Sequence, residues 1–194
     1  MIFRYPDDPI RVPFSELTYY ESQGGWMCQP KWDGWRRPLY LEDGVWQFRS
    51  KYDKGPQAAT RPPAHLIAEL ESLKFPDGTA FDAEWMGPRQ EKGRHFFVLL
   101  DLLYYGGEWQ GEIPCRKRYG NLATLVGVHK VQAPASPNVL VVDSVDSGFM
   151  ELFEKQKKNP LTEGVVLKHG DSKLIGNMGR PQDNKLWKKV KYRE

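Results

Sequence analysis

The sequence predicts an α+β fold made of mostly antiparallel sheets flanked by helices. Short apolar runs bounded by turn-forming residues indicate strands, and amphipathic stretches between them indicate helices. The two kinds of element do not alternate with the regular period that builds a parallel sheet. The chain has 194 residues, of which fifteen are proline and eighteen are glycine. This length fits one domain spanning 1–194, with many turns and short elements.

The N-terminal part is expected to form one short helix, one strand and one hairpin. Proline is favoured in the first turn of a helix, so a helix is expected to start at Pro13. The apolar segment after it leads into Lys31 and has the character of a strand. Asp43-Gly44 stands between two apolar runs, and this dipeptide is a strong hairpin signal. The expected elements are a helix over 13–22 and strands over 26–31, 39–41 and 45–48.

The middle of the chain is expected to contain a helix and two strands. Pro62-Pro63 opens a helix that runs through Leu73, with its leucine and isoleucine side chains on one face. Asp77-Gly78 then precedes a strand over 79–85. Residues 96–103 form a run of eight residues that is apolar except for Asp101, and this run is short enough for a buried strand.

The last third is expected to contain two helices and three strands. Residues 116–125 have a helical pattern, with Leu122 and Leu125 facing inward. An amphipathic stretch over 147–158 predicts the second helix. The strands are expected at 139–142, 165–168 and 186–192.

Composition excludes several classes of protein. No apolar run approaches the ~18 residues of a membrane span. Acidic residues follow soon after Met1, so the N-terminus is not a signal peptide. Cys28 and Cys115 lie far apart and form no metal-type cluster. A cytoplasmic protein with reduced cysteines and no membrane contact is therefore expected.

The net charge is only +3, but the positive charge is concentrated near the C-terminus. Residues 185–193 contain five basic side chains and no acidic one: Lys185, Lys188, Lys189, Lys191 and Arg193. Such a run indicates phosphate contacts, and a solvated basic end is the alternative.

Lys31 lies in a setting that suits a nucleophile. A lysine amine reacts poorly near neutral pH, because its usual pKa is about 10.4, but burial or a neighbouring cation can free its lone pair. Trp32 and Trp35 can exclude water, and Gly34 allows a tight bend and a close approach of the backbone to a ligand. Arg36 offers a fork of donors for phosphate or ribose. A surface turn is the alternative, because Asp-Gly is a common turn.

Two carboxylates and three lysines complete the candidate site. Glu84 and Glu163 are expected at strand ends, where they could bind Mg²⁺, although either alone could be an ordinary surface carboxylate. Lys168, Lys189 and Lys191 could neutralise phosphate charge. Side chains two apart on a strand share a face, so Lys189 and Lys191 should point together and Lys188 away.

Together these segments resemble the covalent nucleotidyltransferase superfamily, which contains ATP-dependent DNA ligases, RNA ligases and mRNA capping enzymes. Its motifs occur here in the family's order: Lys-x-Asp-Gly-x-Arg at 31–36, an arginine motif at Arg49-Ser50, hydrophobic-Asp-Gly-Glu at 81–84, a strand motif at 97–103, Glu-Gly-x-x-x-Lys at 163–168 and Trp-x-Lys-x-Lys at 187–191. Residues 176–180 also resemble the Gly-x-Arg stretch of many DNA ligases, with altered spacing. Ala83 replaces the glycine of the third motif, and Leu100 stands where the family has a base-stacking aromatic residue.

The resemblance implies the role of each candidate residue. Lys31 is the implied nucleophile, which attacks the α-phosphate of ATP to form lysyl-AMP, and Lys189 and Lys191 are the implied catalytic lysines at that phosphate. ATP contacts are implied for Gln29, Arg36, Arg49, Glu84 and Lys168, with Phe97 or Leu100 as the stacking partner of adenine. Glu84 and Glu163 are the implied ligands of Mg²⁺ or Mn²⁺.

The function that the resemblance implies is that of a monomeric ATP-dependent polynucleotide ligase core. AMP would pass from Lys31 to the 5′-phosphate of a nicked strand, which is then sealed. Nicked duplex DNA is the favoured substrate and RNA the next. A capping guanylyltransferase or a non-catalytic nucleic-acid-binding module are further alternatives, but intact Lys31 and Glu163 argue against the latter. The family usually carries a following OB-type domain, which this sequence does not contain. The chain is therefore expected to be a piece of a longer protein, a natural minimal enzyme, or an enzyme that borrows the missing part from a partner.

Overall fold

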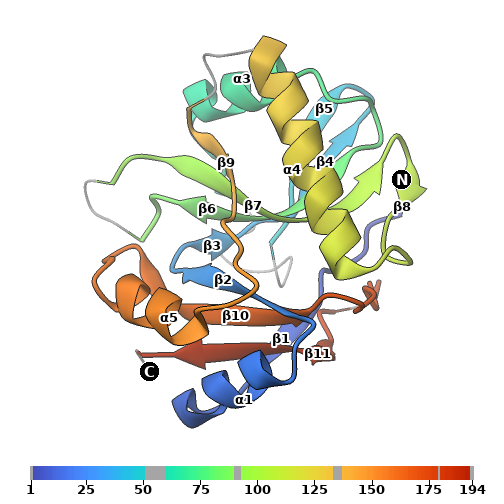
Figure 1. Ribbon diagram of the computed structural model, residues 1–194. Helices are drawn as coiled ribbons and strands as arrows, with labels where there is room; N and C mark the ends of the chain where they lie inside the picture. Colours follow the sequence, from blue (N-terminus) through green and yellow to red (C-terminus); the bar gives the residue numbers. More distant parts are fainter. Residues whose placement is uncertain (1, 51–59, 90–92, 133–136, 179, 193–194) are drawn as a thin grey trace.

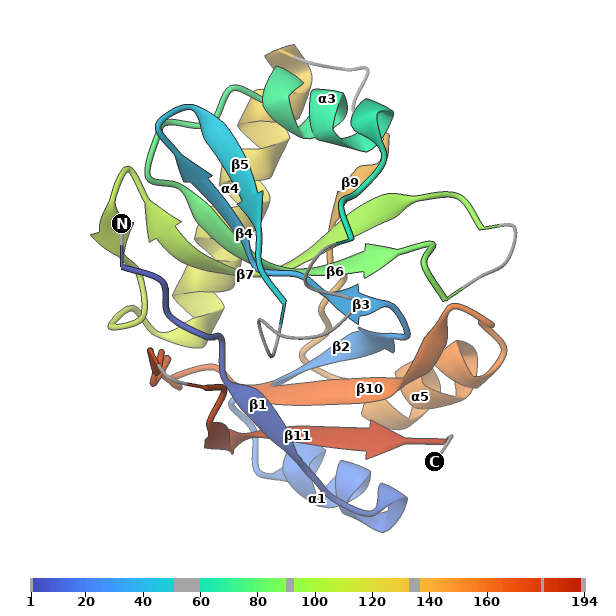
Figure 2. The same ribbon diagram turned by 180° about the vertical axis from the view of Figure 1, so that it is seen from behind.

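The structure, a computed structural model, describes residues 2–50, 60–89, 93–132, 137–178 and 180–192, and for 128–132 the backbone alone. Two β-sheets face each other, and helices cover the outer face of each (Figures 1 and 2). The α+β prediction is therefore confirmed. Within the described residues, no helix is both long and apolar enough to cross a membrane.

The smaller sheet carries the lysine-rich strands in the order β1-β11-β10-β2. All its pairs are antiparallel except β1 with β11, which is parallel. Its outer face packs on helices α1 and α5 through a buried cluster that includes Leu17, Phe149 and Leu167. The elements are β1 (Asp8–Arg11), η1 (Phe14–Glu16), α1 (Leu17–Ser22), β2 (Trp26–Trp32), α5 (Phe149–Lys157), β10 (Thr162–His169) and β11 (Asp183–Lys191).

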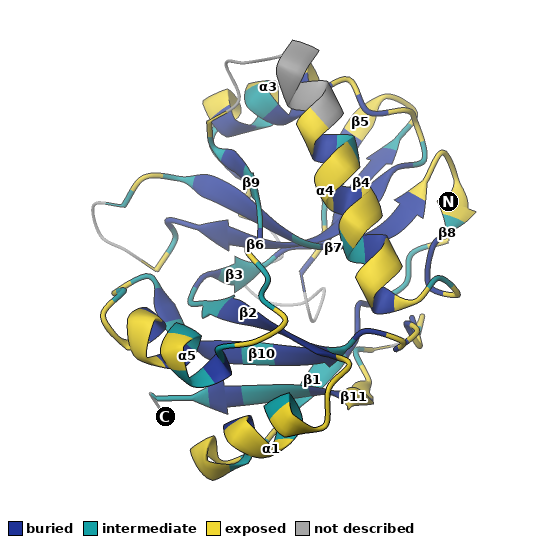
Figure 3. Cartoon of the chain, viewed as in Figure 1, coloured by how far each residue is buried: buried dark blue, intermediate teal, exposed yellow. Residues whose placement is uncertain are grey.

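The larger sheet follows the order β5-β4-β6-β7-β8, with β3 beside β6 and β9 beside β7. Its outer face packs on helices α3 and α4 around a core that contains Leu66, Phe81, Phe97 and Leu122. The central strands β6 and β7 are mostly dark in Figure 3 because they are buried, whereas the outer faces of the helices are exposed. The elements are β3 (Trp35–Arg36), β4 (Leu39–Glu42), β5 (Val45–Phe48), α3 (Ala64–Ser72), β6 (Ala80–Met86), β7 (Phe96–Tyr105), β8 (Glu108–Trp109), α4 (Cys115–Gln132) and β9 (Val139–Val141).

The expected helices and strands are all present, with shifted ends. The expected helix over 13–22 starts with the 3₁₀ turn η1 and becomes α-helical only at Leu17. The expected helix over 116–125 is longer, since α4 continues to Gln132 and buries Val126 in the core. The hairpin at Asp43-Gly44 is confirmed: both residues have positive φ, 53° and 72°, as a mirror-image two-residue turn requires.

Three short strands and two parallel pairings were not anticipated. β3 and β8 have two residues each, which is too short for a periodic signal, and β1 contains Pro9. β1 and β9 pair in parallel with β11 and β7. Such long-range pairings depend on the tertiary fold and leave no local pattern. Gly179 of the stretch at 176–180 and Arg193 of the basic run at 185–193 lie outside the described residues.

Candidate active site

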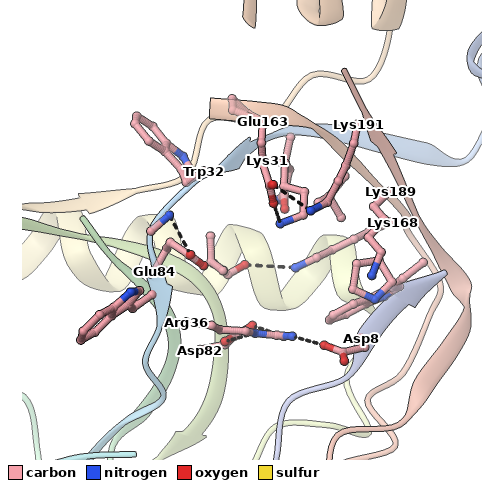
Figure 4. A pocket seen from close by; sticks show the side chains of 18 of the residues that line it. Asp8, Lys31, Trp32, Arg36, Asp82, Glu84, Glu163, Lys168, Lys189 and Lys191 are labelled. Carbon is pink, nitrogen blue, oxygen red and sulfur yellow. Dashed lines mark hydrogen bonds and ion pairs between the residues drawn. The ribbon is translucent and has the colours of Figure 1, made fainter. Parts of the chain in front are cut away.

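The two sheets enclose one large cavity between their inner faces. Its volume is about 380 Å³, within the range of about 300–1,000 Å³ that is typical of small-molecule sites. Figure 4 shows the charged side chains that point into it. The candidate residues that line it are Gln29, Lys31, Arg36, Glu84, Leu100, Glu163, Lys168, Lys189 and Lys191.

Strand alternation places most of these side chains. On β2, Gln29 and Lys31 face the cavity, while Cys28 on the opposite face packs in the core. On β11, Lys189 and Lys191 line the cavity, as expected. Lys188 points to the other face, where its Nζ lies 6.0 Å from the centroid of the Tyr20 ring. The expected difference in direction between adjacent lysines is confirmed.

Glu163 reaches the cavity because of a bulge in β10. The core-facing residues of this strand are Val165 and Leu167, so regular alternation would turn Glu163 toward the core as well. The register slips between Thr162 and Gly164, leaving Glu163 as an extra residue, and bulges re-aim side chains in this way. Gly164 is required beside it: its φ is 153°, and a Cβ there would overlap the carbonyl oxygen of Val190.

Glu163 joins the candidate nucleophile to one of the closing lysines. One carboxylate oxygen is ion-paired with Lys31 Nζ, and the other accepts a hydrogen bond from Lys191 Nζ at 2.7 Å. Burial alone would raise the pKa of the Glu163 carboxyl, but the two ammonium groups outweigh it and lower that pKa. Lys31 is 22% exposed, so its amine remains accessible from the cavity.

Arg36 is fixed by carboxylates from two parts of the chain. Its guanidinium binds Asp82 in a bidentate manner at 2.9 and 2.7 Å and donates to Asp8 at 2.7 Å. Burial of the guanidinium favours its neutral form, but Asp82 and Asp8 outweigh this effect and raise the pKa of Arg36. Arg36 therefore remains a permanently charged, rigid group in the cavity wall.

The turn after Lys31 packs tightly against β6. The N–H group of Gly34 donates to a Glu84 carboxylate oxygen at 3.0 Å. A Cβ at Gly34 would lie 2.6 Å from the carbonyl oxygen of Trp85, so only glycine fits. Burial raises the pKa of Glu84 to about 7, although Lys31 and Arg36 act in the opposite direction.

This pKa predicts a pH dependence of stability that Glu84→Gln should remove. The folded chain holds the Glu84 proton more tightly than the unfolded chain, so the stabilisation is complete below about pH 4.5 and is lost as pH rises through about 7. Relative to Glu84→Gln, the wild type should lose on the order of 3 kcal/mol of unfolding free energy over this interval. Urea unfolding without nucleotide measures it. Glu71→Gln, at an exposed position on α3, is the control; a constant difference between wild type and Glu84→Gln would contradict the prediction.

Two expected ATP contacts do not reach the cavity. Phe97 is fully buried and stacks on Phe48 in the core, with 6.1 Å between ring centroids, so it cannot stack on a base in the cavity. Leu100 does line the cavity, because its neighbour Leu99 faces the core and strand alternation turns the next side chain to the inner face. Arg49 is not among the lining residues, and its guanidinium lies 5.3 Å from the centroid of the Phe3 ring.

Lys168 is present in the cavity but is already compensated. Its Nζ lies 4.2 Å from the centroid of the Trp187 ring, donates to the carbonyl oxygen of Leu100 at 3.2 Å and lies 3.6 Å from Asp101. Asp101 is in turn held by Arg118 through two hydrogen bonds of 2.9 and 3.0 Å. The side chain is 5% exposed, so its position in the cavity wall is fixed by these contacts.

Sequence reasoning missed residues that bind the predicted ones. Asp8 contacts Arg36 from β1, which is remote in sequence and matches no motif. Asp82 binds Arg36 from β6, and its place in the third motif is the signal that could have identified it. Arg89, which pairs with Asp33 at the cavity rim, gave no signal at all. Within the described residues, no three carboxylate, histidine or cysteine side chains cluster as a metal site.

Comparison with solved structures identifies the fold. The chain is similar to a mycobacterial DNA ligase D complexed with ATP and MES (TM-score 0.63, 21% identity), covering 86% of this chain and 54% of that one. It is also similar to the ATP-dependent DNA ligase from bacteriophage T7 in complex with ATP (TM-score 0.63, 14% identity), covering 97% of this chain and 69% of that one. A third similar structure is a Chlorella virus DNA ligase-adenylate (TM-score 0.53, 13% identity), with 96% of this chain and 69% of that one covered.

The shared part has clear limits. This chain spans about half of the mycobacterial ligase chain. No family model matches it, and no curated protein matches it by sequence. The similarity nevertheless extends over most of this chain, 86% and 97% of it in the first two comparisons. The chain therefore has the nucleotidyltransferase fold of the adenylation domains of ATP-dependent DNA ligases.

Proposed function

We propose that this chain is the catalytic core, a single adenylation domain over 1–194, of an ATP-dependent polynucleotide ligase that stores AMP on Lys31. One observation carries the proposal: the Lys31 amine lies in the cavity, in contact with Glu163 and beside Lys189 and Lys191. A nucleophilic amine, a carboxylate and phosphate-binding cations are thereby collected at one end of a pocket of nucleotide size.

The rest of the cavity suits the nucleoside. Leu100 on β7 and Val166 on β10 line it from opposite sheets, and these two apolar side chains are the proposed contacts of the adenine ring. Gln29 is nearly fully buried in the wall and offers an amide that can read the edge of the base. Arg36 is positioned for ribose or phosphate oxygens.

In the first step of the proposed reaction, these residues form lysyl-AMP from ATP. Glu163 releases Lys31, and the amine loses its proton to solvent, because an ion-paired ammonium has no lone pair. The Lys31 nitrogen then bonds to the α-phosphorus as the bond to the oxygen that bridges to the β-phosphate breaks, and pyrophosphate leaves with that electron pair. The bonded nitrogen gives a second proton to solvent, which completes the phosphoamide. Lys189 and Lys191 stabilise the charge on the α-phosphate.

A divalent cation fits this site only as a partner of the phosphates. Glu84 and Glu163 both line the cavity, and Mg²⁺ commonly uses one or two carboxylates together with phosphate oxygens and water. Bound in that way, Mg²⁺ or Mn²⁺ would supply charge neutralisation on the phosphates. In the later steps AMP passes to a 5′-phosphate, and a 3′-hydroxyl displaces it.

The decisive experiment uses ATP labelled at the α-phosphate, with Mg²⁺ or Mn²⁺, and a denaturing gel. The proposal expects label on the protein that survives neutral and alkaline conditions, because phosphoamides do. Label from GTP in place of ATP would indicate a capping-type guanylyltransferase. No label from either would favour a nucleic-acid-binding module, and the test is then repeated with a following OB-type domain or partner added.

DNA is proposed as the substrate over RNA, since the similar structures are described as DNA ligases. The chain should seal a pre-adenylylated nicked DNA duplex better than an RNA-containing nick or single-stranded RNA at one ionic strength. Binding should weaken with salt by a log–log slope of about 0.9 per phosphate neutralised. A preference of about tenfold for an RNA 3′-hydroxyl strand would reverse the assignment.

We further propose that the chain acts as a monomer in the cytoplasm. Both cysteines are free and buried, which agrees with a reducing compartment.

A further inference from the structure

An exposed ion pair stands at the rim of the cavity. Arg89 follows β6 and donates from one guanidinium nitrogen to Asp33, which lies two residues after Lys31. Arg89 lines the cavity, and its side chain is 51% exposed, against 26% for Asp33. The Arg89–Asp33 ion pair therefore connects the larger sheet to the turn that follows Lys31.

Arg89 adds charge at the right place for a phosphate. The positive charge of Arg89 lies close enough to Glu84 to favour the ionised form of that carboxyl group. Lys31 and Arg36 act on Glu84 in the same way. The Arg36 side chain is 18% exposed and is held by two carboxylates, whereas Arg89 is 51% exposed and pairs with Asp33 alone among the carboxylates of the described residues. Exposed ion pairs contribute little to stability, so Arg89 can exchange Asp33 for another anion at low cost.

The chemistry of the side chain indicates which anion. A guanidinium presents a planar fork of donors that matches two oxygens of a phosphate, and the pair with Asp33 engages one of its nitrogens. A carboxylate matches the fork equally well, as Asp82 does on Arg36, so the choice of phosphate follows from the lysines that line the same cavity. A phosphate that projects from the Lys31 end of the cavity toward the rim would meet it.

We infer that Arg89 is a phosphate-binding residue of the active site, which leaves Asp33 when a phosphate reaches the cavity rim. The inference rests on the proposed function for the placement of a nucleotide in the cavity. The phosphate has two possible sources: the β- and γ-phosphates of ATP, or the 5′-phosphate of the nucleic-acid strand. Both present the same chemistry, and binding experiments separate them.

The first experiment compares two nucleotides that differ in the outer phosphates. Trp32, Trp35 and Trp187 line the cavity, so tryptophan fluorescence reports binding. Affinities are measured for AMP and for the ATP analogue with a methylene bridge between the α- and β-phosphates, which cannot react with Lys31. If the source is ATP, Arg89→Gln should lower the ratio of analogue to AMP affinity by about tenfold.

The second experiment compares two nicked duplexes, one with a 5′-phosphate and one with a 5′-hydroxyl at the nick. If the phosphate belongs to the strand, Arg89→Gln should lower the affinity ratio of these duplexes by about tenfold and leave the nucleotide ratio unchanged. A decrease in either ratio supports the inference and names the source.

Two matched variants separate phosphate binding from a structural tie. Arg116 forms a similar exposed pair with Asp146 and does not line the cavity, so Arg116→Gln should change neither ratio. Asp33→Asn breaks the pair but keeps Arg89, so it should not reproduce the decrease. The inference is overturned if Asp33→Asn and Arg89→Gln have equal effects, if neither ratio falls in Arg89→Gln, or if the wild type itself does not prefer the phosphate-bearing ligands.

These ratios require binding but no chemistry. A chain that never forms lysyl-AMP would contradict the proposed ligase activity while the ratios still decide the role of Arg89. Conversely, unchanged ratios in a chain that does form lysyl-AMP would overturn only the inference about Arg89.

Discussion

Lys31→Ala is expected to abolish the covalent AMP label on the protein. Lys31 provides the amine that the Glu163 carboxylate holds in the cavity, and alanine has no atom that can bond to the α-phosphorus. The measurement is the α-labelled ATP assay on a denaturing gel, with Lys31→Ala and wild type side by side. The loss should be complete rather than partial, because the step has no alternative acceptor at this position.

A second variant makes this test independent of folding. Lys31→Arg keeps a cation beside Glu163 but replaces the amine by a weakly nucleophilic guanidinium, so it should fold like the wild type and also remain unlabelled. Thermal unfolding checks the folding of both variants. Persistence of label on folded Lys31→Ala would mean that another residue is the nucleophile.

Lys189→Ala and Lys191→Ala are each expected to lower lysyl-AMP formation by about 10²-fold or more, the usual scale for losing one electrostatic stabiliser. Both side chains line the cavity from β11. Lys191→Ala also removes one of the two cations on Glu163. Single-turnover rates with saturating labelled ATP measure the effect.

Lys188→Ala is the matched control, since it changes the same residue type on the same strand. Its side chain faces α1 and lies near the Tyr20 ring, so its loss should change the rate only slightly. Similar losses at all three positions would show that β11 acts as a diffuse basic patch and that its alternation has no role in the chemistry.

Local signals predicted the elements that carry their own pattern. The Asp43-Gly44 hairpin was recognisable because its turn needs two residues of positive φ, which this dipeptide tolerates. The C-terminal half of α4 was not, because its sequence has no clear apolar face, although Val126 packs in the core there. β1 depends on pairing with β11, more than 170 residues later in the chain.

The candidate site was predictable where motif and strand period agree. Lys31, Lys189 and Lys191 reach the cavity as alternation requires. Phe97 was offered for stacking because it is aromatic and near Asp101, but its parity on β7 directs it into the core. Asp8 could not be found, because its contact with Arg36 joins two strands that pair with different sheets.

The bulge in β10 has a consequence for protein engineering. Glu163 and Lys168 are separated by an odd number of positions, so an ideal strand would display them on opposite sides. If Glu-Gly-x-x-x-Lys were grafted onto a regular host strand, only one of the two charged side chains could face the pocket. The other, the carboxylate or the ammonium, would be turned toward the core. A transplant has to carry the slipped register between Thr162 and Gly164, together with a neighbouring strand whose backbone leaves room only for glycine.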